Sequence, residues 1–381
     1  MKCNGIRGAL NIRPLPRIPL RFIRATAYSR VWACFCVHSA PAGENLLTTM
    51  GYLIKFASIM QIPRISSWFG SWFRSKGYGG DRFAIGLGTH GVYLAKIKLA
   101  GAMPQVVRCE YHEVGAASVA VLEKLRREAN LDGHHVTTLL APGEYQILLV
   151  EAPNVPAEEL KTAIRWKIKD SLNYRIDDAT VDVLQIPAGK SGPERAQSMY
   201  AVAAANGTIQ KYMALFGQAK IKLDVIDIPE MAQRNIAALL EQEDRALVLL
   251  AFDDNGGLLT FTSGGELYLS RRIEISAGQL QDANESLREQ CRDRVELELQ
   301  RSLDYFDRQF NHLSVSRILV SVPDGTGLVE FLAAMMGAKV EKLDLSQAMD
   351  IGAVPALADS EFAAYALPAL GAALRREGSA P

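Results

Sequence analysis

A glycine-bearing stretch constrains the fold of this chain more than any other part of the sequence. Residues 83–97 read Phe-Ala-Ile-Gly-Leu-Gly-Thr-His-Gly-Val-Tyr-Leu-Ala-Lys-Ile, and Gly86, Gly88 and Gly91 have the spacing of a dinucleotide-binding loop. In such a loop the third glycine opens a helix whose N-terminus meets the pyrophosphate. The residues after Gly91 are instead strand formers, and they leave too little chain before the next turn for a crossover helix. The stretch therefore predicts a strand–turn–strand hairpin and not a Rossmann loop.

The overall composition limits the classes of partner. The chain has 381 residues, enough for two or three domains, and its 42 lysines and arginines balance its 42 aspartates and glutamates. This balance gives no reason to expect a nucleic-acid partner. The five cysteines are scattered and odd in number, which favours a reducing compartment over a disulfide framework. Cys34, Cys36 and His38 lack an evident fourth ligand, so no metal site is expected.

The first 80 residues differ in character from the rest. Only basic charges, from Lys2 to Arg30, precede the first acid, Glu44. This composition resembles an organellar transit peptide. The alternative is sequence upstream of the true start, because Met50 and Met60 both precede the first globular pattern. We favour the alternative, since no packing periodicity occurs there, and expect residues 1–80 to be a basic extension that is disordered or not native.

Within this extension, residues 65–76 have the periodicity of an amphipathic helix. Its apolar face would carry Ile65 and the aromatic residues Trp68, Phe69, Trp72 and Phe73, with basic residues beside them. Such a face suits a membrane surface or a partner groove, and it equally suits packing on its own domain. No run in the sequence reaches the roughly 18 uncharged apolar residues of a membrane-spanning helix.

From residue 81 onward the chain repeats one order of elements. Residues 81–143 read as three meandering strands, a helix and a strand, and 206–243 continue with helix, strand, helix. Residues 244–377 give the same order without interruption, with a strong hairpin turn at Asp254-Asn255-Gly256-Gly257 and a long helix predicted over 280–310. Between the two parts of the first half, 144–205 read as strand–helix–strand–strand. The sequence thus predicts an α/β protein with two matching domains and one inserted subdomain.

Twin domains that each open with a glycine-bearing hairpin resemble the actin-like, ribonuclease-H-like fold. Three segments carry a closer resemblance: 158–167 (Glu-Glu-Leu-Lys-Thr-Ala-Ile-Arg-Trp-Lys), 299–306 (Leu-Gln-Arg-Ser-Leu-Asp-Tyr-Phe) and 370–375 (Leu-Gly-Ala-Ala-Leu-Arg). With them, the inserted subdomain is similar to that of FtsA- and PilM-type proteins, and the chain from about residue 82 to 376 resembles the PilM/MshI family of type IV pilus biogenesis proteins, in particular the MSHA branch. None of the three segments is a catalytic signature.

The resemblance implies where ATP-binding members would hold their catalytic groups. Their first hairpin carries an aspartate and then a lysine, and this chain has Gly86 and Tyr93 at those positions. The acid of the second hairpin falls on Ala251, and the glycine pair after the fourth strand falls on Val322 and Pro323. Without these carboxylates most of the positioned charge that phosphoryl transfer requires is missing. We therefore expect a degenerate ATPase site, no catalytic residue and no required cofactor.

Residual binding of ATP and magnesium is the remaining possibility for this site. The resemblance assigns it to Gly88, Thr89, Gly91 and Gly371. Asp253 and Asp254 are the nearest acids, and an Asn-Gly hairpin turn normally exposes such side chains to solvent.

The expected function is that of a non-catalytic scaffold of a type IV, MSHA-like pilus assembly. The resemblance implies a cytoplasmic protein, peripheral at the bacterial inner membrane, whose partners are a PilN-like membrane protein and other pilus components. The cytoplasmic tail of the PilN-like protein would bind between the first domain and its insertion, and Trp166 is either a contributor to that contact or a core residue. The alternative function is an actin-like ATPase with a divergent active site.

Overall fold

The computed structural model describes residues 80–375, except 89, 100–102, 116 and 188–196. The N-terminal extension, with its predicted amphipathic helix, therefore lies outside the described residues. Short 3-10 helices occur at Lys169–Ser171, Ile176–Asp178, Leu345–Gln347 and Pro355–Ala358.

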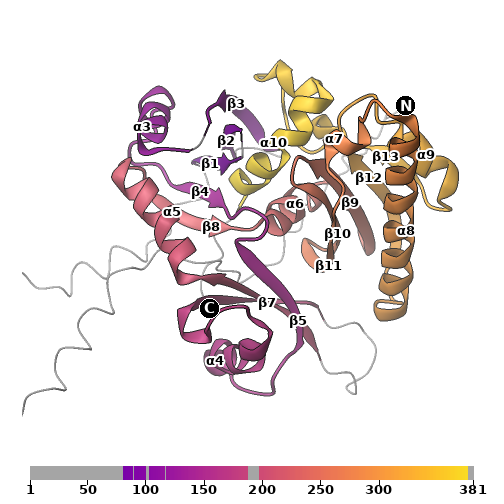
Figure 1. Ribbon diagram of the computed structural model, residues 1–381, viewed down its shortest axis with the longest axis horizontal. Coiled ribbons are helices and arrows are strands. Elements are labelled where there is room, and N and C mark those ends of the chain that lie inside the picture. The colour runs from indigo at the N-terminus through magenta and orange to yellow at the C-terminus, as the bar shows by residue number, and fades with distance from the viewer. Residues whose placement is uncertain (1–79, 89, 100–102, 116, 188–196, 376–381) are drawn as a thin grey trace, which may run out of the picture. The chain divides into compact units, whose positions relative to one another are not determined.

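The first domain is built on a five-stranded sheet in the order β3-β2-β1-β4-β8 (Figure 1). Its strands are β1 (Asp81–Leu87), β2 (Gly91–Lys98), β3 (Gln105–Glu113), β4 (Val136–Leu139) and β8 (Leu223–Asp227). β1 and β2 pair antiparallel over their full length, so the predicted hairpin is confirmed. β4 and β8 continue the sheet in parallel. The helices of this domain are α3 (Val119–Glu128), α5 (Asn206–Gln218) and α6 (Pro229–Ala237).

The second domain repeats this arrangement. Its sheet has the order β11-β10-β9-β12-β13, again with two antiparallel pairings followed by two parallel ones. The strands are β9 (Arg245–Asp253), β10 (Gly256–Ser263), β11 (Glu266–Ile273), β12 (Ser314–Ser321) and β13 (Val340–Lys342). Residues 246–250 and 252 of β9 are buried, and 251 is partly buried, because helices and strands cover both faces of the sheet. The predicted duplication is confirmed.

The long helix of the second domain begins later than predicted. A short helix, α7 (Ala277–Leu280), precedes α8 (Glu285–Gln309), whereas the sequence periodicity predicted one helix over 280–310. Ser276 caps α7 in a capping box with Gln279, and the Asn284 side chain accepts a hydrogen bond from Ser286 N–H at the start of α8. Two caps this close define two helices, because each one satisfies the free N–H groups of a separate first turn. The remaining helices are α9 (Leu328–Met335) and α10 (Ser360–Ala373).

The insertion forms a three-stranded sheet, β5-β7-β6, with one helix on it. Its elements are β5 (Tyr145–Glu151), α4 (Ala157–Ile168), β6 (Ala179–Gln185) and β7 (Ser198–Ala205). Ile164 and Ile168 of α4 pack on one face in a small separate core. Tyr145 and Tyr200, on the other face, join the main core, and the Tyr200 hydroxyl lies 3.3 Å from both Tyr268 O and Ser270 N in β11. The insertion is therefore anchored to the second domain as well as to the first.

Helix α10 belongs to the second half of the chain but packs mainly on the first domain. Its apolar face, including Ala366, Leu370 and Ala373, shares a core with Ala84 and Ile97 of the β1–β2 hairpin. It also crosses α6, and in Figure 1 it lies between the two sheets. Within the described part of the chain, no helix combines the length and the apolar character needed to cross a membrane.

Candidate functional site

The tips of the two matching hairpins face a cleft between the domains. Gly88 N–H donates to Gly91 O across the first tip, with a nitrogen–oxygen distance of 2.8 Å. The close packing around Gly91 leaves no room for a side chain, since a Cβ there would lie 2.3 Å from Cε2 of Tyr111 and 2.5 Å from His112 O. The predicted nucleotide residue Thr89 lies outside the described residues. Gly88 and Gly91 both line the cleft, so the structure brings these two predicted site residues together.

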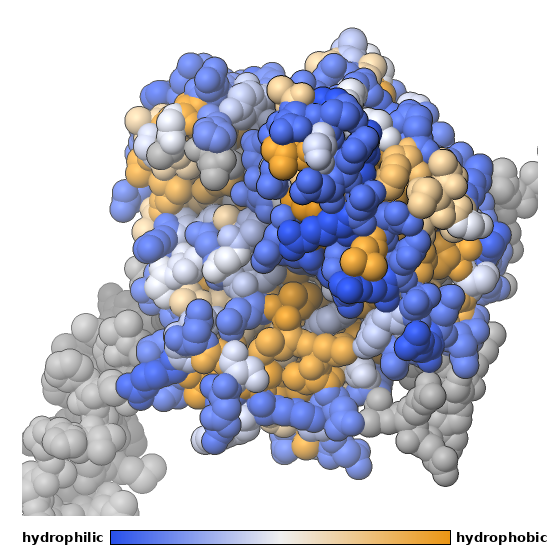
Figure 2. Space-filling view, turned by 45° about the vertical axis from the view of Figure 1, so that its right-hand side comes forward, coloured by the Kyte–Doolittle hydropathy of each residue, from blue (hydrophilic) through white to orange (hydrophobic). Residues whose placement is uncertain are grey.

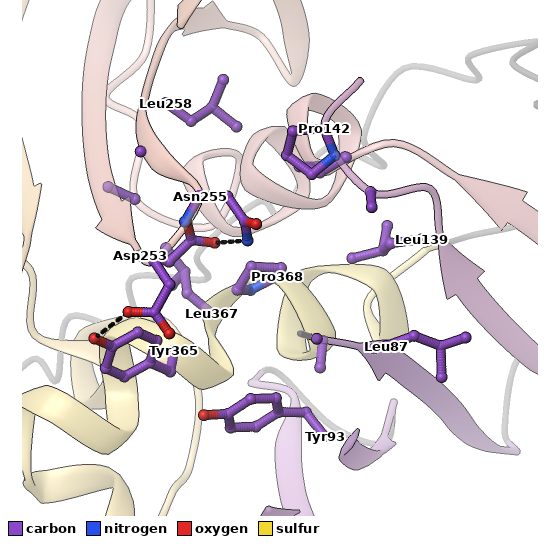
Figure 3. A pocket seen from close by; sticks show the side chains of 18 of the residues that line it. Leu87, Tyr93, Leu139, Pro142, Asp253, Asn255, Leu258, Tyr365, Leu367 and Pro368 are labelled. Carbon is purple, nitrogen blue, oxygen red and sulfur yellow. Dashed lines mark hydrogen bonds between the residues drawn. The ribbon is translucent and has the colours of Figure 1, made fainter. Parts of the chain in front are cut away.

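The cleft contains a cavity of about 340 Å³, which is near the lower end of the range for small-molecule sites. Its walls come from both hairpin tips, the end of β4, α6 and one side of α10 (Figure 3). Pro368 stands inside α10 on the cavity side, and Leu87, Leu139 and Leu367 add apolar surface. The lining is mostly apolar with a few polar groups, which is the usual character of a binding pocket.

Two aspartates of the second hairpin provide carboxylates to the cavity lining. Asp253 is partly buried, contrary to the expectation that the Asn-Gly turn exposes it; Asp254 is exposed at the rim. Asp253 Oδ1 accepts a hydrogen bond from Asn255 N at 2.7 Å, and its other oxygen lies 3.4 Å from Asn255 Nδ2 (Figure 3). Burial raises the pKa of Asp253 above its ordinary value, and the hydrogen bonds from Asn255 oppose that shift. The turn residues line the cavity, and tertiary contacts of this kind cannot be predicted from the Asn-Gly turn sequence alone.

Tyrosine side chains form another part of the lining. Tyr93 and Tyr111 have ring centroids 4.7 Å apart, and the Tyr365 hydroxyl donates to Asp254 Oδ1 at 3.0 Å. In Figure 3 the hydroxyl of Tyr93 points toward Tyr365. Burial, followed by the neighbouring Tyr111 and Tyr365, raises the pKa of Tyr93 well above its ordinary value, so its phenol stays neutral. Sequence reasoning noted Tyr93 only as the replacement for a lysine.

Behind the cavity, a buried ionic cluster joins three parts of the chain. Glu230 on α6 is fully buried, and its Oε1 lies 3.2 Å from a guanidinium nitrogen of Arg272 on β11. Tyr145 of the insertion donates to Glu230 Oε2 at 2.6 Å and lies 2.6 Å from the same guanidinium. Burial is the largest influence on Arg272 and lowers its pKa, but Glu230, Tyr145 and Asp253 together outweigh burial, and the pKa is raised overall. No sequence signal suggested this cluster, because its members lie on separate elements.

A third acid of the lining, Glu144, immediately precedes β5. Its Oε2 accepts hydrogen bonds from the Tyr212 hydroxyl at 2.6 Å and from Ala141 N at 2.8 Å. The carboxylate and its tyrosine both line the cavity. Burial and the bond to Glu144 raise the pKa of Tyr212.

Gly371, the fourth predicted nucleotide residue, lies elsewhere. It does not line the cavity and instead marks the crossing of α10 with α6, where a Cβ would lie 2.1 Å from Ala232 O. Asn235 Nδ2 donates to Gly371 O at 2.9 Å across the same crossing. The residues at the expected glycine pair, Val322 and Pro323, are buried and also absent from the lining. Nucleotide binding through the predicted glycines stays a prediction.

Trp166, the predicted partner residue, is on the outer side of α4 and 67% exposed. The alternative that it is a core tryptophan is therefore wrong. Lys169 Nζ lies 5.7 Å from its ring centroid. The predicted membrane contacts Trp68, Phe69, Trp72 and Phe73 lie outside the described residues. Over the described ranges, no three His, Cys, Asp or Glu side chains come together in a group that could hold a metal ion.

The two matching domains, the cleft between their hairpins and the inserted subdomain define an actin-like fold, as predicted. Among solved structures the chain is similar to the PilM–PilN type IV pilus biogenesis complex, with a TM-score of 0.60 and 20% identity over 79% of this chain and 99% of that chain. No protein-family model and no curated protein matches the sequence.

Two further solved structures are similar at a lower level. One is the cytoplasmic domain of EpsL, an inner membrane component of the type II secretion system of Vibrio cholerae, with a TM-score of 0.41 and 12% identity over 64% of this chain and 83% of that chain. The other is a Bacteroides thetaiotaomicron protein with an actin-like ATPase fold and unknown function, with a TM-score of 0.43 and 12% identity over 72% of this chain and 94% of that chain.

Proposed function

We propose that this protein is a non-catalytic cytoplasmic scaffold of a type IV pilus assembly, MSHA-like in its branch, at the inner membrane of a bacterium. The observation that carries the proposal is the fold match to the PilM–PilN complex, which spans nearly all of the matched chain. The partner is the cytoplasmic tail of a PilN-like membrane protein, together with other pilus components. Fold alone does not define function, so the surface of the insertion supplies the second argument.

The insertion carries two exposed apolar side chains that suit a partner contact. Leu149 is 49% exposed on β5, on the sheet face opposite α4, because its neighbours Leu148 and Val150 pack into the core beneath that helix. Trp166 is exposed on the outer side of α4. Figure 2 shows a band of apolar surface low on the molecule, bordered by hydrophilic residues. Leu149 is paired with Tyr200, whose hydroxyl contacts β11 of the second domain. A substitution at Leu149 therefore tests for a partner bound between the insertion and the two main domains, and a substitution at Trp166 tests for one bound on the outer side of α4.

The test is co-purification of a PilN-like membrane protein with point variants of the full chain. Deleting 144–204 is unsuitable, because Tyr145 and Tyr200 belong to the main core. Leu149→Asp should abolish co-purification, whereas Leu297→Asp, at a 44% exposed position on α8, should not. Retention of the partner by Leu149→Asp contradicts the groove assignment. If Trp166→Ala abolishes co-purification and Leu149→Asp does not, the partner binds on the outer face of α4.

The absence of catalysis is part of the proposal. Gly86 and Ala251 both line the cleft and replace the two metal-organising acids of ATP-binding relatives. The alternative, a nucleotide-binding actin-like ATPase, would place its nucleotide in this cavity, because Gly88 and Gly91 lie on its wall. Labelled ATP with magnesium separates the two: the scaffold proposal expects no tight binding, and tight magnesium-dependent binding abolished by Gly88→Glu supports the ATPase.

Peripheral membrane association through residues 65–76 is a separate proposal. It rests on the sequence pattern of Trp68, Phe69, Trp72 and Phe73 beside basic residues. Replacing these four aromatic residues by serine should lower co-sedimentation with anionic vesicles. Unchanged co-sedimentation would reject this anchor.

A further inference from the structure

The interdomain cavity carries negative charge, which does not match a polyphosphate ligand. Its lining includes the carboxylates of Asp253, Asp254 and Glu144. The one arginine in the lining is Arg272, and its guanidinium is already paired with the fully buried Glu230 at 3.2 Å. Among the described residues of the lining there is no lysine, and His90 is the remaining ionisable nitrogen, exposed at the rim. The charge that a ligand meets is therefore dominated by carboxylates.

Two backbone N–H groups at the described parts of the hairpin tips are also occupied. At the first hairpin tip Gly88 N–H is bonded to Gly91 O, and at the second tip Asn255 N–H is bonded to Asp253 Oδ1. A phosphate-binding loop works by directing such free N–H groups at the anion. These two N–H groups are instead bonded within their own turns, so they do not point at a ligand. The carboxylates of the lining and the occupied state of these two N–H groups thus disfavour an anionic ligand.

The same wall has the composition of a site for an organic cation. Tyr93, Tyr111 and Tyr365 supply aromatic rings beside the two aspartates, and Tyr365 donates its hydroxyl to Asp254 at 3.0 Å. The Tyr93 hydroxyl has no hydrogen-bond partner among the described residues and lies on the same wall (Figure 3). Aromatic faces attract ammonium and guanidinium groups, and adjacent carboxylates neutralise their charge. Leu87 and Leu139 line the opposite side (Figure 3), and this apolar surface suits an alkyl chain.

We propose that this cavity binds a small organic cation, an ammonium or guanidinium group on a short aliphatic chain, at Asp253 and Asp254 with Tyr93 and Tyr365. The inference goes beyond the scaffold function and does not depend on it, because the cavity lies between the hairpins and not on the insertion surface. The same ammonium chemistry can come from a free amine or from a lysine side chain of a bound polypeptide.

Isothermal titration calorimetry of the full chain at low salt tests the proposal. The ligands are putrescine, N-acetyl-lysine amide, and ATP plus magnesium. Putrescine or the lysine derivative should bind with a dissociation constant below about 1 mM, and ATP should bind more weakly. Tighter binding of putrescine assigns the site to a free amine, and tighter binding of the lysine derivative assigns it to a polypeptide side chain. No heat from either amine, or ATP binding tighter than both, overturns the proposal.

Matched variants localise the binding. Asp253→Asn with Asp254→Asn should weaken amine binding at least about tenfold, because two carboxylates at contact distance are lost. The control replaces Asp177 and Asp178, an exposed pair on the insertion, by asparagine and should leave binding unchanged. Tyr93→Leu should weaken binding about threefold while the fold, followed by circular dichroism, is retained. Equal affinity in the cavity variant and the control also overturns the proposal.

Discussion

Replacing Arg272 by methionine should destabilise the protein strongly, because it leaves the carboxylate of Glu230 buried without its cation. The Glu230 side chain is 0% exposed and Arg272 is 33% exposed at 3.2 Å from it. Removing one partner of a buried pair costs about 3–5 kcal/mol. We expect the lower end, about 3 kcal/mol, because the Tyr145 hydroxyl still donates to Glu230 at 2.6 Å and water can enter from the side that Arg272 left.

Urea unfolding followed by circular dichroism measures this effect as a change in the transition midpoint. A loss of about 3 kcal/mol corresponds to a decrease of about 1 M or more, with a slope of about 1–3 kcal/mol per molar urea. Arg271→Met is the matched control: it is the adjacent residue, and its 3.4 Å pair with Glu298 is partly exposed on both sides. That pair should contribute less than about 1 kcal/mol.

The Arg272→Met result is decisive in either direction. If its midpoint is no lower than that of Arg271→Met, the buried carboxylate does not depend on Arg272 and the reasoning is wrong. A double variant, Glu230→Leu with Arg272→Met, provides a second check. It should recover part of the loss, because it removes the unpaired buried charge itself.

Three other substitutions or modifications test the packing and the titration of buried groups. Gly371→Ala should destabilise by about 1–3 kcal/mol in urea unfolding, because its Cβ would lie 2.1 Å from Ala232 O, whereas Gly217→Ala on α5 has open space and should be neutral or stabilising. Burial raises the pKa of Glu266 from 4.5 to about 7, so the folded state binds a proton that the unfolded chain releases between those values. Stability should therefore fall as the pH rises across that window, and Glu266→Gln should remove this part of the profile in urea midpoints measured from pH 4 to 8. Burial also raises the pKa of Cys109 to about 12, so iodoacetamide at pH 8 should leave it unmodified in the native protein and alkylate it after unfolding, as peptide mass mapping would detect.

The sequence predicted the repeated topology because the signals for it are local. The strand formers after Gly91 and the Asn255-Gly256 turn identify two hairpins, and hairpins are set by neighbouring residues. The break between α7 and α8 also had a local signal, the Ser276–Gln279 capping box, which the apolar periodicity across it obscured.

The candidate site was less predictable because its residues are distant in the sequence. Tyr93 and Tyr365 meet at one wall only through the packing of α10 on the first sheet. A glycine can serve a ligand or a close crossing of helices, and nothing in the sequence around Gly371 separates the two. Trp166 was ambiguous for a similar reason, since a helix position beside a buried isoleucine does not show whether its own side chain is covered.

The packing of α10 on the first domain has a consequence for synthesis of the chain on the ribosome. Domains commonly fold in order as they emerge, beginning with the N-terminal one. Here the sheet face that carries Ala84 and Ile97 lacks α10 until residues 360–373 have been made, after the rest of the second domain. The first domain therefore keeps an apolar face exposed until α10, the last described helix, has been synthesised. Nascent chains that end before α10 should be the ones that need a chaperone, and the two domains should complete folding together.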